Sequence, residues 1–445
     1  MNKVEKTIVK TESGMRRFAI HINLPRKKVF FSTPAFFIEP KSSRDLGFIC
    51  DWISNPKLKN NCFQGLVLPY NKVRRILLPY KSRAIQKTLM GNSKEETFKN
   101  LINSKVVIID PLTEGAYYKL GLIESDLWGL PEEFIEQTKR INESNKISKN
   151  KRIDKIKLYR EHLYEISNKL QNFTLKFLSQ LKLNGSDILL APSNLIIPEI
   201  PESIDLSIKI NEETHKICEN EEGWIPAAYF VIKTSVLEDF EAFQKILNYI
   251  DKEKPTMIFF KIVDSYGLDS RNAAIQRDNL KIFLKGLAHV SQQFNIPSFF
   301  LNVDSLGLFL IQSRIDGFCT PSNGIVEPTF VSYKNTDLPD YQRGKYFLVP
   351  KLSLVSMRAL EKIYNTKGKT FPCPYSCCED FDNKRFKTFI GIYKQKLIRI
   401  HYYNSIDNLV LEAHKAINDG TVRAAFNKLA NSSCSHYLEI LPDFN

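Results

Sequence analysis

Apolar runs of strand length recur along this chain, and several of them are separated by amphipathic segments of helix length. The runs are almost continuously hydrophobic, which is typical of strands buried on both faces of a parallel sheet. The alternation predicts an α/β fold, and its extension to about eight units favours a (β/α)8 TIM barrel. The expected strands are Val29–Phe37, Gly65–Leu68, Lys105–Asp110, Ile188–Ile197, Ala227–Ile232, Thr256–Val263, Ser298–Val303, Ile315–Phe318 and Lys345–Val349. The expected helices include Leu237–Asp251, Arg271–Phe294 and Leu352–Tyr364.

A doubly wound open sheet is the structural alternative for the same alternation. Nucleotide-binding sheets of that kind carry a glycine-rich phosphate loop between a strand and the following helix. No apolar run in this sequence is followed by such a loop. The barrel is therefore the favoured architecture.

A charged helical segment, residues 131–183, interrupts the alternation. Its middle, Ser144–Lys151, is rich in Lys, Asn and Ser. We expect a helical hairpin inserted between barrel units. Such a charge run is usually a solvated face, although basic helices also lie along phosphate backbones. The predicted organisation is an N-terminal part of the barrel (1–130), the hairpin (131–183), the remainder of the barrel (184–355) and a C-terminal zinc-binding helical region (356–445).

The chain is basic, with 63 Lys and Arg against 49 Asp and Glu and a formal charge of +14. This excess favours an anionic partner, either nucleic acid or an acidic membrane surface. Basic groups in the first hundred residues could neutralise phosphates: Arg26–Lys28, Lys72–Arg75 and Lys81–Arg83. No apolar stretch reaches the ~20 residues that span a bilayer, and the N-terminus lacks a signal-peptide core. We expect a cytoplasmic protein.

Three of the eight cysteines, Cys373, Cys377 and Cys378, fall within six residues, and His401 follows 23 residues after the last of them. Cysteine thiolates and histidine nitrogens are the ligands of closed, tetrahedral zinc sites. The set therefore predicts a structural Zn²⁺ that holds the last barrel loop to the C-terminal helices. The two-residue gap usual between paired cysteines is missing, so ordinary cysteines beside an unrelated histidine are the alternative.

Three segments carry a resemblance to a known family. The tail from His401 to Leu409 and the helix after it, together with the cysteine cluster, resemble the end of tRNA-guanine transglycosylases. The segment Ser32-Thr-Pro-Ala-Phe-Phe37 is similar to an early strand of that family. Ile315-Asp-Gly-Phe-Cys-Thr-Pro321 lies where the family has Gly-Val/Ile-Asp-x-Phe-Asp-Cys.

The resemblance implies a base exchange in tRNA or, as in the related DNA enzymes, in DNA. Such enzymes cleave the N-glycosidic bond of a guanine through an aspartate nucleophile and then accept a 7-deazaguanine base. One carboxylate must attack as an anion while another moves protons on the departing and entering bases. Nucleic acid, a 7-deazaguanine base and a homodimeric or heterodimeric partner are the partners it implies.

Asp110 is the first candidate for a catalytic carboxylate, since it ends the run KVVIID at the position of the family's Asp-Ser-Gly-Gly-Phe-Gln motif. The attacking aspartate of the family is replaced, because Phe-Asp-Cys becomes Phe318-Cys319-Thr320. Asp264 and Asp304 also end expected strands and could join Asp110 in one acidic mouth, or could serve as helix caps. Asp316, two residues before Phe318, matches a different, structural aspartate of the family's motif and is a further candidate for this mouth.

Three residues are candidates for base binding. Gly115 and Gly267 are the glycines retained from the family's base motif and base-recognition loop. Tyr117 follows Asp110 closely and could stack on a base, although core packing would also suit it. The loss of motif residues leaves a catalytically inactive homologue, acting as a nucleic-acid-binding or partner subunit, as the alternative. An unrelated barrel enzyme with metal-free acid chemistry is a further one.

Overall fold

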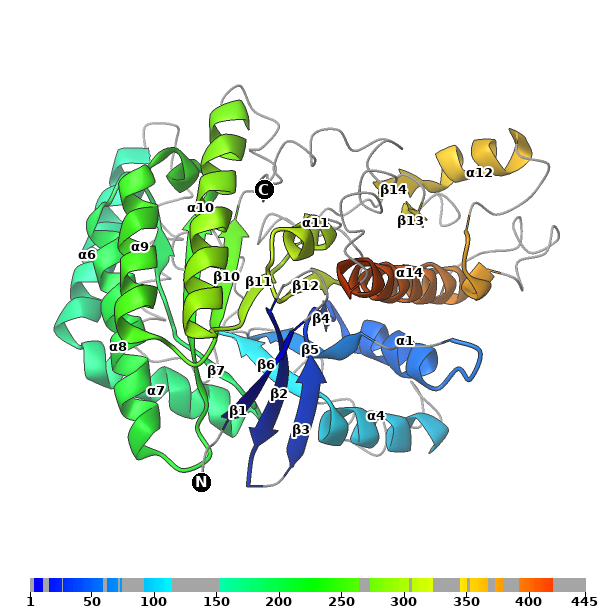
Figure 1. The fold of residues 1–445 in the computed structure, drawn as a ribbon, viewed down its shortest axis with the longest axis horizontal. Coiled ribbons are helices and arrows are strands. Elements are labelled where there is room, and N and C mark those ends of the chain that lie inside the picture. Colours follow the sequence, from blue (N-terminus) through cyan, green and yellow to red (C-terminus); the bar gives the residue numbers. More distant parts are fainter. Residues whose placement is uncertain are drawn as a thin grey trace.

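The computed structural model describes residues 4–10, 16–25, 27–58, 62–70, 73, 92–113, 152–263, 273–303, 306–322, 345–349, 353–366, 373–378 and 392–418. Within these residues, eight parallel strands form a nearly closed barrel (Figure 1). In order around the barrel they are β4 (Ala35–Glu39), β5 (Phe63–Pro69), β6 (Val106–Asp110), β7 (Leu189–Leu190), β9 (Pro226–Lys233), β10 (Ile258–Val263), β11 (Ser298–Leu301) and β12 (Gly317–Pro321).

The strand order follows the chain and returns from β12 to β4, in parallel pairing. The join between β6 and β7 is the weakest, with a parallel bridge between Ile108 and Ile188. A further short strand, β8 (Leu195–Ile196), pairs with β9. The prediction of an α/β fold with a parallel sheet is confirmed, and an open doubly wound sheet is not what forms.

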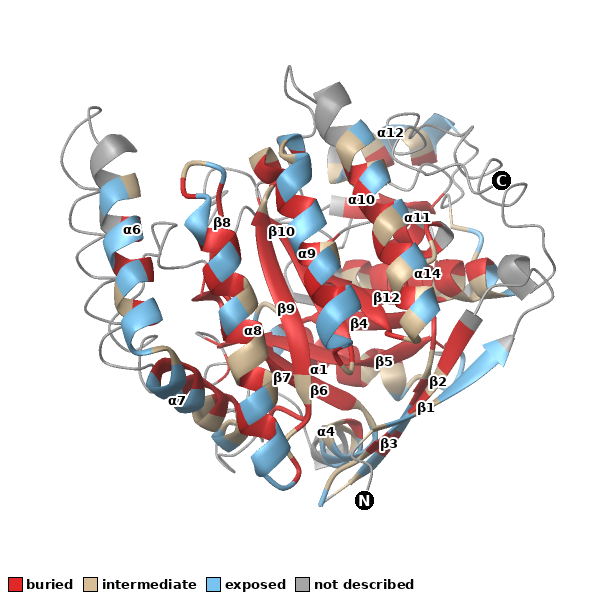
Figure 2. Ribbon diagram, turned by 60° about the vertical axis from the view of Figure 1, so that its left-hand side comes forward, coloured by how far each residue is buried: buried red, intermediate tan, exposed pale blue. Residues whose placement is uncertain are grey.

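Helices cover the outside of the barrel, with their buried faces toward the strands and their exposed faces outward (Figure 2). They are α1 (Ser43–Ile53), α4 (Asn92–Ser104), α6 (Arg152–Asn168), α7 (Leu170–Leu183), α8 (Glu202–Asn220), α9 (Phe240–Glu253), α10 (Ala273–Phe294), α11 (Leu306–Gln312) and α14 (Ile392–Asn418). Among the helices that the structure describes, none has both the length and the apolar character needed to cross a lipid bilayer.

Helix α9 shows how the sequence sets these elements. Asp239 caps its start, because the carboxylate accepts a hydrogen bond from Ala242 N at 3.2 Å. Phe243, Ile246 and Ile250 recur at helical spacing and are all buried. A short 3₁₀ turn, η5 (Thr234–Glu238), connects the helix to β9.

Side chains alternate between two cores along each barrel strand. On β4, Phe36 and Ile38 point outward into the layer between strands and helices. Ala35 and Phe37 point into the barrel, where they join Phe299 and other inward side chains. By the same alternation Glu39, the last residue of β4, is also an inward position.

An antiparallel sheet covers the N-terminal end of the barrel, here called the base. It comprises β1 (Val4–Lys10), β2 (Arg16–Asn23) and β3 (Lys28–Ser32). Phe31 reaches into the barrel, with its ring centroid 6.1 Å from that of Phe37. Lys6 Nζ donates to the carbonyls of Thr256 and Asn295, which precede β10 and β11. The predicted run Val29–Phe37 thus divides between two sheets, because Pro34 has no N–H to continue the ladder.

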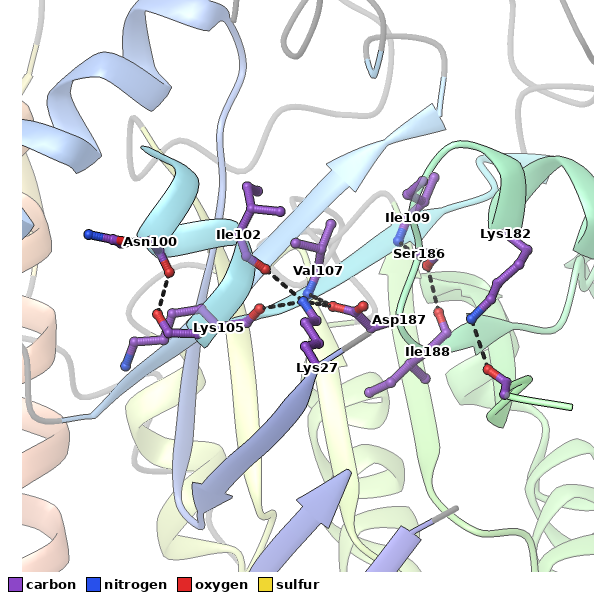
Figure 3. A network of polar contacts seen from close by, with 12 residues as sticks. Lys27, Asn100, Ile102, Lys105, Val107, Ile109, Lys182, Ser186, Asp187 and Ile188 are labelled. Atoms are coloured by element: carbon purple, nitrogen blue, oxygen red, sulfur yellow. Dashed lines mark hydrogen bonds and ion pairs between the residues drawn. The ribbon is translucent and has the colours of Figure 1, made fainter. Parts of the chain in front are cut away.

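A polar network holds the base together where β6 and β7 barely pair (Figure 3). Lys27 forms an ion pair with Asp187 and donates to the carbonyls of Ile102 at 2.8 Å and Lys105 at 3.0 Å. Val107 N donates to the Asp187 carboxylate at 2.8 Å. The side chains of Lys27 and Asp187, bonded to backbone groups of residues 102–107, therefore join β6 to β7 where ladder bonds are missing.

Several boundaries differ from the predicted ones. The run Ile188–Ile197 forms two short strands, and Lys345–Val349 lies outside the barrel as β13 (Lys345–Leu348), paired with β14 (Ser353–Ser356) ahead of α12 (Met357–Thr366). The predicted hairpin is described only from residue 152, as α6 and α7, and residues 131–151 lie outside the described residues. Leu178 and Leu181 pack α7 into the core against the barrel.

Candidate functional site

A buried polar group lies at the C-terminal end of the barrel, here called the mouth. Asp110 ends β6 and is 3% exposed. Its Oδ2 lies 2.6 Å from Lys261 Nζ, and its Oδ1 accepts from Tyr229 OH at 3.0 Å and from Leu112 N at 3.1 Å. The carboxylate thus has a cation, a phenol and a backbone amide around it.

Strand alternation brings these side chains together. Phe259 and Val263 are inward residues of β10, so Lys261 between them points the same way. Tyr229 is an inward residue of β9. Because β7 and β9 stand between β6 and β10 in the sheet, the ion pair crosses the barrel interior. Residues 151 positions apart meet where active sites of parallel barrels lie.

A second carboxylate ends β4. Glu39 is 7% exposed, and its Oε1 lies 2.5 Å from Lys41 Nζ. The backbone ties this corner to the end of β12, because Ser322 N donates to Glu39 O at 2.8 Å. Glu39 and Asp110 are the only acidic residues on the barrel strands that the structure describes.

Cys319 is an inward residue of β12. It lies in the segment whose sequence resembles the transglycosylase motif, where that motif has an aspartate. Burial raises the pKa of this thiol well above its usual value, and the nearby Glu39 and Asp110 raise it further against an opposing effect of Lys41. The thiol therefore stays protonated at neutral pH and cannot replace an attacking carboxylate.

The structure does not bring Asp316 to the mouth. Asp316 precedes β12, its backbone pairs with Ser298 and Ala35, and its Oδ2 accepts from Ser298 N at 2.9 Å. All of these atoms belong to N-terminal ends of barrel strands, so Asp316 lies at the base. This corrects the expectation of a shared acidic cluster with Asp110. Asp316 lies at the beginning of the expected strand Ile315–Phe318, and in the structure it directly precedes β12.

The remaining predicted residues of the mouth lie outside the described residues. They are Asp264, Asp304, Gly115, Tyr117 and Gly267. Sequence reasoning missed Glu39, Lys261 and Tyr229. The signal for Lys261 was present, since a single lysine inside the run IFFKIV has no solvated face to occupy.

A separate cluster of four side chains could bind a metal ion. Cys373, Cys377 and Cys378 lie at the short 3₁₀ turn η9 (Ser376–Cys378), and His401 comes from α14. Their ligand atoms lie within 4.8 Å of one another. His401 Nδ1 is 3.5, 3.4 and 3.3 Å from the three sulfur atoms, in chain order. The predicted Cys3His grouping is confirmed as a candidate metal site.

The surroundings of His401 fit metal binding. Its Nε2 lies 2.7 Å from the Phe347 carbonyl, which can only accept, so Nε2 carries the proton. Nδ1 then presents its lone pair to the three sulfur atoms, which is the arrangement of a metal-bound imidazole with an outer partner. The Tyr346 ring stacks on the imidazole at 4.2 Å and 9°. These contacts fix the ring in the orientation that a metal ligand needs.

Helix α14 connects the metal cluster to the mouth. Tyr402, next to His401, has its OH 2.5 Å from Thr320 Oγ1 on β12, beside Cys319. Asp407 on the same helix accepts from Cys62 N at 2.8 Å, just before β5. The Tyr403 and Trp52 rings pack with centroids 5.7 Å apart, joining α14 to α1. Helix α14 therefore contacts β12 next to the last residue of that strand.

Comparison with known proteins gives no family. No protein-family model matches the chain, and no curated protein matches it. The function must be argued from the two sites themselves.

Proposed function

We propose that this chain is a transglycosylase that exchanges a guanine in tRNA or DNA for a 7-deazaguanine base. The observation that carries the proposal is the pair of buried carboxylates, Glu39 and Asp110, at the mouth of a parallel α/β barrel. Base exchange with a covalent intermediate needs two carboxyl groups in one site. The resemblance to tRNA-guanine transglycosylases supplies the substrate class.

Lys261 and Tyr229 suit Asp110 to proton transfer. A lysine ammonium 2.6 Å away and a phenol 3.0 Å away can give protons to a departing base and take them from an entering one. A buried ion pair costs desolvation free energy that an apolar pair would not, so its presence at a barrel mouth favours a catalytic over a stabilising role.

We further propose that the metal is zinc and that it is structural. Three thiolates and one imidazole complete a tetrahedral Zn²⁺ site and leave no position for a substrate. The ion would hold η9 against α14, and through Tyr402 and Thr320 it would fix the end of β12.

A second candidate function is favoured by Cys319. At the position of the family's attacking aspartate the chain has a neutral thiol, as a non-catalytic homologue would. Such a protein would bind nucleic acid, or pair with an active subunit, without cleaving a glycosidic bond.

Release of labelled guanine separates the two candidates. Purified protein is incubated with tRNA or with duplex DNA carrying labelled guanine, and a 7-deazaguanine base is added. An exchanging enzyme releases label from one of them, and Asp110→Asn reduces the rate by about 10³-fold. Binding of both substrates without release from either contradicts the exchange and supports the non-catalytic candidate.

A further inference from the structure

The mouth has lost the aspartate expected on β12 but holds a carboxylate on the adjacent strand. Glu39 is the register partner of Pro321 on β12, and Cys319 is the partner of Phe37, the previous inward residue of β4. Glu39 and Cys319 are therefore diagonal neighbours on the barrel wall. A carboxylate at Glu39 can reach the region in front of Cys319.

The contacts of Glu39 suit an attacking group. Its carboxylate forms an ion pair with Lys41, whose Nζ contacts Oε1. Lys41 is the one side chain that hydrogen-bonds this carboxylate within the residues that the structure describes. Lys41 is fixed in turn, because its backbone N donates to Asp45 Oδ2 at 3.1 Å.

Asp110 has the opposite surroundings. Both of its oxygens accept hydrogen bonds, from Lys261, Tyr229 and Leu112. Such a carboxylate is a poor nucleophile, because attack would have to break these bonds, but it is well placed to pass protons. The two carboxylates of the mouth thus differ in the way that a nucleophile and an acid/base group should differ.

We propose that Glu39 is the nucleophile of the exchange, supplied from β4 in place of an aspartate on β12. This inference rests on the proposed function and names the group that performs its first step. Glu39 Oε2 attacks C1′ of the target nucleotide while the C1′–N9 bond breaks, and the electron pair goes to N9 of guanine.

Proton transfer balances both steps. The Lys261 and Asp110 pair gives a proton to the departing guanine and takes one from the entering 7-deazaguanine. The nitrogen of that base then attacks C1′, the ester bond to Glu39 breaks, and its electron pair returns to the carboxylate. No oxidant or reductant is needed.

Two measurements on the full-length protein test this. In the first, wild-type protein is mixed with tRNA or duplex DNA without an entering base, denatured and digested, and the covalent adduct is located by mass spectrometry. The adduct is expected on the peptide that contains Glu39. An adduct on any other residue overturns the inference while leaving the exchange function intact.

In the second, release rates are compared for Glu39→Gln and Glu199→Gln. Glu199 is a matched control, a glutamate paired with Lys233 at 3.6 Å on the segment after β8. We expect Glu39→Gln to lose at least about 10³-fold in rate with substrate binding within about threefold, and Glu199→Gln to stay within about threefold. A Glu39→Gln rate within tenfold of wild type overturns the inference.

A rescue variant separates chemistry from folding. Adding Cys319→Asp to Glu39→Gln returns a carboxylate to the mouth from β12, and we expect part of the rate to return, with the adduct moving to residue 319. If Glu39→Gln does not fold, the position of the adduct in wild-type protein decides whether Glu39 is the nucleophile. If the wild-type protein releases no guanine, the proposed function is contradicted. Results with the variants alone test only whether Glu39 is the nucleophile.

Discussion

The two ends of the barrel each hold a buried lysine–aspartate pair, but the pairs are built differently. At the base, Lys27 and Asp187 are bound to backbone: Lys27 Nζ donates to two carbonyls, and Val107 N donates to Asp187 (Figure 3). At the mouth, Lys261 and Asp110 meet across the barrel interior, and a tyrosine hydroxyl completes the group.

The difference indicates two roles. The base pair compensates for a gap in the ladder between β6 and β7, so its desolvation cost is offset by closing the barrel. The mouth pair closes no ladder, since Asp110 and Lys261 come from strands that are not neighbours. The same two residue types therefore stabilise the fold at one end and, under the proposed function, supply the proton-transfer groups at the other.

The largest expected effect concerns the Cys3His site, which Tyr402, the residue after the ligand His401, joins to Thr320 near the mouth. We expect about one zinc per chain, lost when Cys377 and His401 are both changed to Ala. Structural zinc contributes apparent binding free energies on the order of 10 kcal/mol, so the metal-free variant should unfold at a much lower temperature. Metal analysis and thermal unfolding measure the two effects.

Amide hydrogen exchange shows which part of the fold loses protection when the metal is removed. Removal of the metal with a chelator should raise the exchange of amides at Thr320 on β12 and Tyr402 on α14. The amides of Val107 and Ile109, which are held by Asp187 and Ser186 at the base, should change little. A folded protein that binds no metal would contradict both the zinc site and the transglycosylase assignment.

The second prediction compares the two pairs directly through Asp110→Asn and Asp187→Asn. The first should reduce guanine release by about 10³-fold, or about 4 kcal/mol of activation free energy, with a smaller change in stability. The second should lower the free energy of unfolding by about 3–5 kcal/mol, because it leaves Lys27 buried without its anion. Release assays and chemical denaturation of both variants form the test.

Equal losses of stability in both variants would show that the two ends do not differ in role. Equal losses of guanine release in the two variants, after correction for the folded fraction, would also show that the two ends do not differ in role. The informative result is a crossed pattern, in which each variant is strongly impaired in one measurement and weakly in the other.

Local patterns in the sequence predicted much of the fold but little of the mouth. Continuous apolar runs such as VVIID and IFFKIV gave the buried parallel strands, and three closely spaced cysteines gave the metal cluster. Strands β1 and β2 were missed, because RRFAIHIN alternates like a half-buried strand and lacks a continuous apolar run.

The contacts of Asp110 could not be predicted, because they depend on the order and register of strands far apart in the chain. Lys261 and Glu39 each follow a two-residue period that fixes which side they face, but only barrel closure decides that both face Asp110. The misplacement of Asp316 has a different origin. It was grouped with the aspartates of the mouth although it lies at the beginning of the expected strand Ile315–Phe318, and the beginnings of parallel barrel strands meet at the base.

The last prediction concerns the pH dependence of stability at the base. Burial raises the pKa of Asp316 from its usual 3.8 to about 7, although hydrogen bonds from Ser298 and the nearby Arg17 oppose the shift. Between these two pH values the native state holds a proton that the unfolded state has released. Its contribution to stability is therefore full below pH 3.8 and is lost as the pH rises to 7, by about 1.4 kcal/mol per pH unit.

Asp316→Asn removes this titration while keeping an oxygen that can accept from Ser298 N. His162 and His414, whose pKa values burial lowers to about 4, titrate in both proteins and cancel in the difference. Denaturation of both proteins from pH 4 to pH 7 should show the variant gaining on the wild type with the slope given above. Parallel stability curves would mean that Asp316 is ionised throughout this pH range, and would contradict the prediction.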